Sequence, residues 1–533
     1  KPPIMKKQFT ILCFSLLFSN PLKGDSPNPT FAFDQYEVAT NLIDNTRIVT
    51  GNFLSANQMM DIAMVHRDST GTINLDIYQF QDDNWRLALD TTLHQNTIFV
   101  DAAIINGKDR LVTFSEGQLN WFDPQTGKTS LLLKLPFEFR TDPKWGIPQV
   151  RITHDLNNDG QDDIIAPSVD GFWVATQLSD GTFSEPIKIG PPEPYLNQST
   201  FDDKRNYGEV GINAMTIPWY LSRVHNFDYN QDGRKDLIFW NEDHFDVYVQ
   251  IEDGSFATNP ITFQTDVHFD SDGTYSIVFS FAQSNTFSLI FGTRKSTNFT
   301  VLHSIEDMNG DGIPDLVTHS LTGRSVFKMK SRYIVHFGSA TNGGILFSKY
   351  QATAANSDGK GGATQSGGYA NQWLRDIDGD GNTDIIRYDV KIGLTGMINV
   401  LLGRHLIINF ETHRMVGGRF LSHPDGKKKI KAHVNIYDEK GGFFPFMLLG
   451  DLSGDGLAEL LVATKKNEIQ IFGGQPELNI LNTEPIKVNL LVPSMETGTW
   501  LKDLNQDGKQ DILLYYHTKE KEKPFRLVTL ITK

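Results

Sequence analysis

Six segments of the chain share one nine-residue pattern, D-x-[DNS]-x-D-G-x-x-[DE], followed by two or three apolar residues. Oxygen-bearing side chains at positions 1, 3, 5 and 9, with a glycine turn at position 6, suit a hard cation that takes six to eight oxygen ligands. Mg²⁺ gives up its water reluctantly, so the pattern predicts Ca²⁺. Any one copy can also be an Asx-rich turn without metal, but six copies in one register argue against that alternative.

The predicted ligands are the side chains at positions 1, 3, 5 and 9 and the backbone carbonyl at position 7, which gives about six Ca²⁺ sites. In chain order they are Asp155, Asn157, Asp159, Gln161 and Asp163; Asp228, Asn230, Asp232, Arg234 and Asp236; Asp307, Asn309, Asp311, Ile313 and Asp315; Asp376, Asp378, Asp380, Asn382 and Asp384; Asp451, Ser453, Asp455, Leu457 and Glu459; and Asp503, Asn505, Asp507, Lys509 and Asp511.

The sequence excludes the EF-hand, which needs a Glu at position 12 and a helix on each side of the loop. Position 12 is occupied by Ala166, Phe239, Thr318, Arg387, Val462 and Leu514. Each loop is followed by a short apolar run typical of a buried strand. We therefore expect calcium loops between β-strands.

The repeat extends beyond the loop. Segments 177–183 and 250–256 each close a strand with a glycine turn, and 335–338 and 471–474 occupy the equivalent place in later copies. On these residues the chain resembles the FG-GAP/VCBS repeat family, which includes the propeller heads of integrin α-subunits, over roughly residues 45–533. The resemblance implies a β-propeller and calcium binding, and it implies little about function.

Four short antiparallel strands per repeat predict an all-β fold, an eight-bladed β-propeller. Residues 46–66 and 99–122 have the shape of the repeat without its acids, and we interpret them as metal-free units. The last unit contains only three strands, so residues 33–42 are expected to supply the fourth and close the ring. Seven blades are the alternative, if one degenerate unit is only an extension.

One propeller domain over residues 25–533 is expected, with insertions at about 190–221, 266–300, 351–371 and 412–444. Residues 5–24 begin with a basic Met5-Lys6-Lys7 and continue with an apolar stretch, as in a signal peptide, with a buried strand as the alternative. An exported protein follows: periplasmic, cell-surface or secreted. The single cysteine, Cys13, lies in that segment, so calcium would replace disulfides as the stabilising crosslink.

The composition restricts the possible partners. The net charge is −15, much of which belongs to the predicted metal ligands, and no basic field is available to bind nucleic acid. No apolar run is long enough for a transmembrane segment, and no known catalytic motif is present. The lysines at 427–431 can bind an anionic glycan or headgroup, although a solvated loop is the simpler interpretation.

A second candidate site is the strand upstream of each loop, which in a propeller lines the central channel. Its polar and aromatic residues are candidates for binding an acidic sugar, or simply face a wet channel: His154, Arg223, His225, His303, Trp373 and Arg375. The leading hypothesis is a monomeric, non-catalytic binding module for a protein or glycan ligand. A polysaccharide lyase or other carbohydrate-active enzyme is the alternative, by fold analogy alone.

Overall fold

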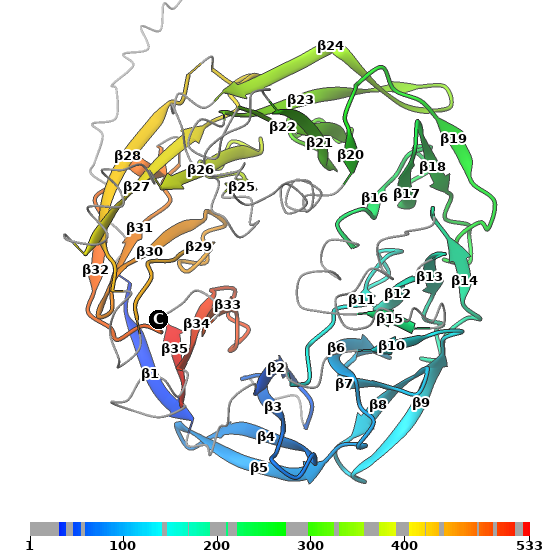
Figure 1. The fold of residues 1–533 in the computed structure, drawn as a ribbon, viewed down its shortest axis with the longest axis vertical. Helices are drawn as coiled ribbons and strands as arrows, with labels where there is room; N and C mark the ends of the chain where they lie inside the picture. Colours follow the sequence, from blue (N-terminus) through cyan, green and yellow to red (C-terminus); the bar gives the residue numbers. More distant parts are fainter. Residues whose placement is uncertain are drawn as a thin grey trace, which may run out of the picture.

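The chain forms a ring of β-sheets in a computed structural model (Figure 1). The structure describes residues 31–38, 46–54, 59–140, 146–168, 170–191, 209–211, 221–272, 297–323, 330–356, 372–390, 404–421, 423–435, 442–476, 479–493, 498–516 and 526–533. The expected signal peptide, Cys13 and most of the expected insertions at 190–221, 266–300 and 351–371 lie outside these residues.

Eight sheets are arranged radially as the blades of the ring. Within each blade, neighbouring strands are antiparallel and follow one another in chain order from the centre to the rim, apart from β20 and β1, which are described below. Blade one has β2 (Arg47–Gly51), β3 (Asp61–Arg67), β4 (Ile73–Gln81) and β5 (Asn84–Thr92). Blade two has β6 (Phe99–Ile105), β7 (Lys108–Ser115), β8 (Gln118–Asp123) and β9 (Lys128–Lys134). Blade three has β11 (Thr153–His154), β12 (Asp163–Ser168), β13 (Gly171–Ala175) and β14 (Ile187–Ile189). Blade four has β16 (His225–Phe227), β17 (Asp236–Asn241), β18 (His244–Tyr248) and β19 (Ile261–Phe263).

The remaining blades follow the same order. Blade five has β20 (Ser271–Asp272), β21 (Thr297–Glu306), β22 (Asp315–Gly323), β23 (Lys330–Thr341) and β24 (Gly344–Asn356). Blade six has β25 (Gln372–Arg375), β26 (Asp384–Val390), β27 (His405–His413) and β28 (Gly426–His433). Blade seven has β29 (Met447–Gly450), β30 (Glu459–Lys465), β31 (Glu468–Phe472) and β32 (Ile486–Val488), with the 3₁₀ turn η4 (Ile480–Asn482) before β32. Blade eight has β33 (Thr499–Lys502), β34 (Asp511–Tyr516) and β35 (Arg526–Thr532).

The two ends of the described chain close the ring in one sheet. The strand β1 (Phe33–Val38) pairs antiparallel with β35 as the outer strand of blade eight, with Phe33 opposite Thr532 and Val38 opposite Leu527. Across the closure, the indole Nε1 of Trp85 in blade one donates a 2.9 Å hydrogen bond to Oγ1 of Thr529 in blade eight. The eight-bladed fold and its closing strand are therefore confirmed, and the seven-bladed alternative is wrong.

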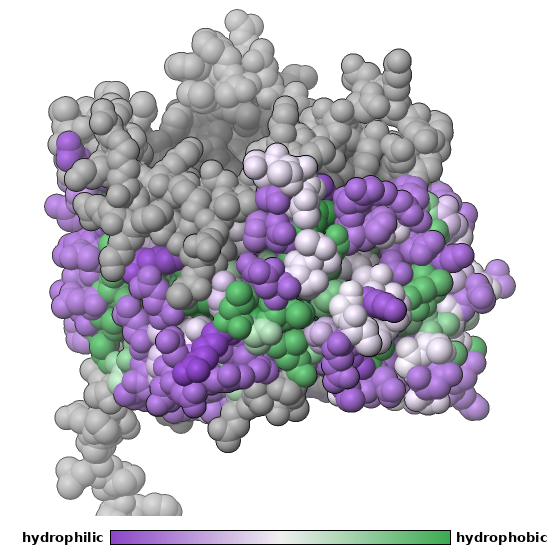
Figure 2. All heavy atoms as spheres, turned by 90° about the horizontal axis from the view of Figure 1, so that it is seen from below, coloured by the Kyte–Doolittle hydropathy of each residue, from purple (hydrophilic) through white to green (hydrophobic). Residues whose placement is uncertain are grey.

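The core lies between the blades, because each sheet buries both faces against its neighbours. One cluster joins blades eight and one and includes Val38, Ile62, Trp85 and Leu513. Others join blades two, three and four, or blades six and seven. Seen edge-on in Figure 2, the described rim is mainly hydrophilic, with hydrophobic side chains between the polar ones.

Two details differ from the expected domain plan. Part of the expected insertion at 412–444 belongs to blade six, because β28 is its outer strand and pairs with β27 over eight residues, from His405 opposite His433 to Thr412 opposite Gly426. The lysines at 427–431 therefore lie in a strand, where Lys427, Lys429 and Lys431 are exposed on alternate positions. In blade five, the short β20 adds a fifth strand, parallel to β21, on the inner edge.

A further pair of strands, β10 (Glu138–Arg140) and β15 (Glu209–Gly211), runs parallel outside the eight blades. Over the part of the chain that the structure describes, no helix has the length and apolar character needed to cross a bilayer.

Candidate metal loops and central cavity

Each of the six acidic loops, in blades three to eight, connects two antiparallel strands near the centre of the ring: the first and second strands, or β21 and β22 in blade five, where β20 comes first. The glycine at position 6 has φ between +83° and +88° in all six copies, a conformation that L side chains rarely adopt. In every copy its amide donates to the Asp at position 1 over 2.8–3.0 Å. The glycine turn therefore folds the loop back onto its first carboxylate.

Position 4 is also left-handed, which the pattern alone did not indicate. It is Asn158, Gln231 or Gln506 in three copies, with φ of 65°, 61° and 58°, and glycine in the other three. The amide at position 7 then donates to the Asp at position 5 over 2.8–3.0 Å in all six loops. Both bonds orient carboxylate oxygens, and each oxygen keeps lone pairs for a cation.

The acid at position 9 has a second task, because it ties the loop to the blade. Asp163 accepts from Leu156 N (3.2 Å) within its loop and from Gln177 N (2.8 Å) beyond the next strand, and its side chain is fully buried. The same two bonds recur at Asp236, Asp315, Asp384 and Asp511. At Glu459 one oxygen, Oε2, accepts both loop amides, and the buried Oε1 has no hydrogen-bond partner.

Burial raises the pKa of these position-9 acids. Burial, together with the neighbouring loop carboxylates, raises the pKa of Asp384 to about 8 and that of Asp163 to about 7. A carboxylic acid whose ionised form is disfavoured by burial and like charge is stabilised by a bound cation. The chemistry of the donor set thus fits a divalent metal ion.

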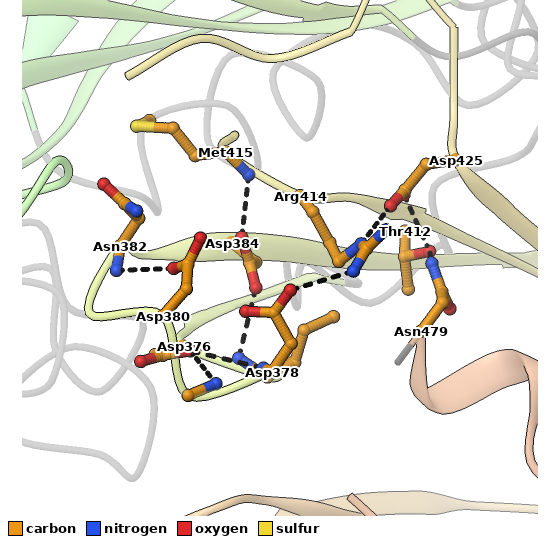
Figure 3. Close-up of polar contacts among 12 residues, drawn as sticks. Asp376, Asp378, Asp380, Asn382, Asp384, Thr412, Arg414, Met415, Asp425 and Asn479 are labelled. Carbon is orange, nitrogen blue, oxygen red and sulfur yellow. Dashed lines mark hydrogen bonds and ion pairs between the residues drawn. The ribbon is translucent and has the colours of Figure 1, made fainter. Parts of the chain in front are cut away.

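The 376–384 loop of blade six brings its acids closest together (Figure 3). Among the described residues, Asp376, Asp378 and Asp384 are the one group of three possible metal-ligating side chains whose ligand atoms lie within 4.8 Å of one another. Asp378 is 5% exposed, and its buried Oδ1 has no hydrogen-bond partner. An unpartnered buried carboxylate oxygen beside two further acids fits a hard cation such as Ca²⁺.

The guanidinium group of Arg414 neutralises part of the negative charge of this loop. Arg414, which follows β27, donates from Nη1 to Asp378 Oδ2 over 2.9 Å and from Nε to Asp425 Oδ2 (Figure 3). Asp425 also accepts from Thr412 Oγ1 over 3.2 Å. The guanidinium therefore links the loop to the connection between β27 and β28, and it leaves Asp378 Oδ1 for a metal ion.

A backbone bond joins two pairs of neighbouring loops. The amide at position 8 of a loop donates to the start of the loop in the preceding blade: Thr383 N to Met308 O and Gln510 N to Asp451 O, each over 2.7 Å. In blade one, Met60 N makes the equivalent 2.7 Å bond to Leu504 O of blade eight. The loop at 307–315 cannot make this bond to its own preceding loop, because its position 8 is Pro314.

The two degenerate units lack the ligand set in different ways. In blade one, Asp61 keeps the role of position 9, since it is fully buried and accepts from Leu54 N over 2.8 Å. Burial raises its pKa to about 6. In blade two the loop is replaced by a tight turn at Asn106 and Gly107, whose φ values of 51° and 67° are those of a two-residue hairpin.

The centre of the ring contains a cavity of about 750 Å³. Its walls come from the inner strands β2, β6, β11, β25, β29 and β33 and from residues next to β11. Of the six residues expected to line the channel, His154 and Trp373 do so. Trp373 lies against Tyr388, with 5.4 Å between ring centroids.

The other four do not lie among the described lining residues. Arg223 is buried and pairs with Asp272 of β20 over 2.8 Å. His225 is buried, and burial lowers its pKa to about 4. His303 lies on β21, which is not the inner edge of its blade because β20 lies there, and its ring contacts Tyr333. Arg375 is exposed. The six residues therefore do not form one ring.

Further residues that the sequence did not single out line the cavity. Trp500 and Lys502 precede the loop at 503 by three and one residues, the same offsets at which Trp373 and Arg375 precede the loop at 376. This shared offset was the signal that could have found them. Asp101 and Arg151 also line the cavity, but no repeated offset marks them. Asp101 belongs to the degenerate blade two, and Arg151 lies in the segment that borders it.

No family model and no curated protein matches the chain. It is similar in structure to a lectin of Agrocybe aegerita that recognises non-reducing terminal N-acetylglucosamine, with 14% identity, 83% of this chain and 92% of that chain covered, and a TM-score of 0.35. A biofilm matrix protein of V. cholerae is 12% identical, with 93% and 88% covered and a TM-score of 0.27. The WD40 domain of SCAP from fission yeast is 10% identical, with 86% and 98% covered and a TM-score of 0.29. At such low identities and TM-scores, these similarities say nothing of what the chain binds.

Proposed function

We propose that the chain is an exported, calcium-stabilised β-propeller of the FG-GAP/VCBS type, and that it acts as a non-catalytic binding module for a protein or glycan ligand. The observation that carries the proposal is the common geometry of the six loops, in which backbone amides orient the acids at positions 1, 5 and 9 while burial leaves the position-9 charge without a counter-ion. Such a loop gains most from a cation that the protein binds only when folded.

The location of the loops supports a structural role for the metal. Each loop is held to its blade by the position-9 acid, and position-8 amides link the loops of blades five and six and of blades seven and eight. A cation there would therefore stiffen the scaffold without contacting a ligand in the central cavity. Affinities of about 10⁻⁴–10⁻³ M, typical of extracellular calcium modules, would keep the sites filled outside the cell.

The proposal is tested on the purified chain without its first 24 residues. Metal analysis is expected to find about six Ca²⁺ per chain, and EGTA is expected to lower the melting temperature, with recovery on adding Ca²⁺ but not Mg²⁺. A glycan and protein array, run with Ca²⁺ and with EGTA, is expected to show binding that is lost with chelation. A metal-free protein with an unchanged melt would refute the calcium part, and an array without any ligand would refute the binding part.

A further inference from the structure

The central cavity has the size and lining of a ligand site. Its volume of about 750 Å³ lies within the usual range of small-molecule sites, about 300–1,000 Å³. The wall combines apolar residues of β29 with hydroxyl and amide side chains such as Thr50, Gln149 and Thr499. A mixed wall of this kind suits a ligand that has both hydroxyl groups and an apolar face.

The charge of the cavity is opposite to that of the chain as a whole. Two of its lining residues, Arg151 and Lys502, are exposed cations, and neither forms an ion pair with any residue that the structure describes. Because the chain carries a net charge of −15, two cations without ion-pair partners in a concave site stand out. A cleft with one sign of charge concentrates ligands of the opposite sign.

Among the described lining residues there is a single carboxyl group, that of Asp101, against the two cations. Asp101 is buried, and its oxygens already accept hydrogen bonds from Ala102 N (2.9 Å), Thr153 Oγ1 (2.9 Å) and Ile152 N (3.2 Å). These bonds tie β6 to β11, which is a structural task. Burial raises the pKa of Asp101 to about 6, so the group is still mostly ionised at pH 7, and the described wall carries two positive charges against this negative one.

An aromatic side chain lies in the same wall. Trp500 is 37% exposed, with its ring 6.4 Å from that of Tyr515, and it comes from the same strand as Lys502. In a strand, residues two apart lie on the same face about 7 Å from one another, so the indole and the ammonium group are presented together. An apolar ring beside a cation suits a sugar ring that carries a carboxylate.

We propose that the central cavity binds a uronate residue of an acidic polysaccharide, with Lys502 at its carboxylate, Trp500 against its ring and Arg151 as the second cation of the wall. The inference rests on the proposed binding function and names the class of ligand. The guanidinium of Arg151 is suited to a carboxylate because it presents paired donors. His154, whose Nε2 lies 3.3 Å from the carbonyl oxygen of Arg151, borders the same part of the wall and is a positioning residue for that segment.

The test is isothermal titration of the calcium-loaded chain with three short acidic oligosaccharides: tetragalacturonate, tetramannuronate and a hyaluronan tetrasaccharide. At least one is expected to bind, whereas the neutral galactose tetramer does not. The double variant Arg151→Gln/Lys502→Gln is expected to lose at least about tenfold in affinity, equal to about 1.4 kcal/mol. Trp500→Ala is expected to weaken binding as well, because it removes the apolar face.

The matched control is Lys429→Gln/Lys431→Gln on β28, which removes the same charge from an exposed strand outside the cavity and should bind as the unaltered chain does. Three results would overturn the inference: no binding of any of the three acids, equal binding of the neutral tetramer, or unchanged affinity in the cavity double variant. If a neutral glycan or an acidic protein binds the chain and its cavity variant equally, the proposed binding function stands and the uronate site fails. Near-native melting of the variants shows that folding is not the cause.

Discussion

Arg414 donates a 2.9 Å hydrogen bond to Asp378, the position-3 acid of the 376–384 loop, although the two residues are 36 positions apart in the chain. The same guanidinium bonds to Asp425, so one cation holds two acids beside a candidate calcium site. This arrangement distinguishes blade six from the other five loop-bearing blades, whose position-3 residue is Asn or Ser.

The variant Arg414→Gln should therefore make the protein depend more strongly on calcium. Without the guanidinium, Asp378 and Asp425 lose their counter-ion, so the chelated protein should unfold at a lower temperature. Saturating Ca²⁺ should restore most of the loss, because a cation can neutralise Asp378. Thermal melts in EGTA and in millimolar Ca²⁺ measure both effects, and an equal loss under both conditions would contradict this prediction.

The acids at positions 5 and 9 of that loop should differ in their effect on the metal-free protein. Asp384→Asn removes a buried carboxyl group whose ionised form is disfavoured, so in EGTA at pH 7 it should raise the stability, although one of the amides of Met415 and Ile377 loses its acceptor. Asp380→Asn alters an exposed residue that bonds one loop amide, so it should reduce only the stabilisation by Ca²⁺. Urea unfolding with and without Ca²⁺ separates the two, and identical curves for both variants would argue against a burial cost at Asp384.

Gly312→Ala should destabilise its loop through backbone conformation alone. The residue has φ of +83°, and an added Cβ would meet nothing within 4 Å. The expected cost is about 1–2 kcal/mol, the usual penalty for a left-handed L residue. Gly343→Ala, at a position with no positive φ and similarly open space, is the matched control. A melt of the first variant no lower than that of the second would count against the prediction.

The ring closure should be sensitive to charge on one face of β1 only. Val38 is 1% exposed and packs between blades eight and one, so Val38→Asp should cost about 3 kcal/mol or more because it buries an unpaired charge. Gln35→Asp adds the same charge at an exposed position of the same strand and should be nearly neutral. Equal unfolding midpoints in urea would show that β1 does not close the ring in solution.

Acid should destabilise the protein partly through His303. Burial lowers its folded-state pKa to about 4, whereas the unfolded chain has the ordinary value of 6.5. Between these two pH values the unfolded state binds more protons, so stability falls as the pH falls through this window, by up to about 1.4 kcal/mol per pH unit. The groups that face His303 are His319 and Tyr333, with Arg387 over the Tyr333 ring.

Replacing His303 with Phe or with Gln removes this titration, so both variants should lose less stability between pH 6.5 and 4 than the unaltered chain does. The burial of His319 lowers its pKa as well, so part of the acid sensitivity should remain. Urea unfolding at a series of pH values measures the slope. Parallel slopes for all three proteins would refute the assignment to His303.

The number of blades could be predicted because the acidic loop marks the same strand connection in six units and two further units keep the strand pattern without its acids. The final unit lacks a strand, which residues 33–38 supply. The outer strand β28 was not recognised, since only Ile430 and Ala432 among its apolar residues are buried and three exposed lysines surround them. Outer strands face water on one side, so their apolar pattern is weaker than that of the inner strands.

The candidate metal-ligating side chains of each loop could be predicted from residue spacing, because all those of one loop lie within nine residues of the sequence. The partners of Asp384 and Asp378 could not, since Met415 and Arg414 come from the end of another strand. The cavity lies further from local sequence still. A few residues from each of several strands form its wall, and these strands are up to hundreds of positions apart in the chain. Only the packing of the blades brings Asp101 and Trp500 to one surface.

The short strand β20 makes the centre of the wheel asymmetric. It covers the inner edge of β21, and the described wall of the cavity takes no residue from blades four and five. A molecule held there would therefore contact an incomplete arc of the wheel and not the full ring, although the repeating scaffold has nearly rotational symmetry.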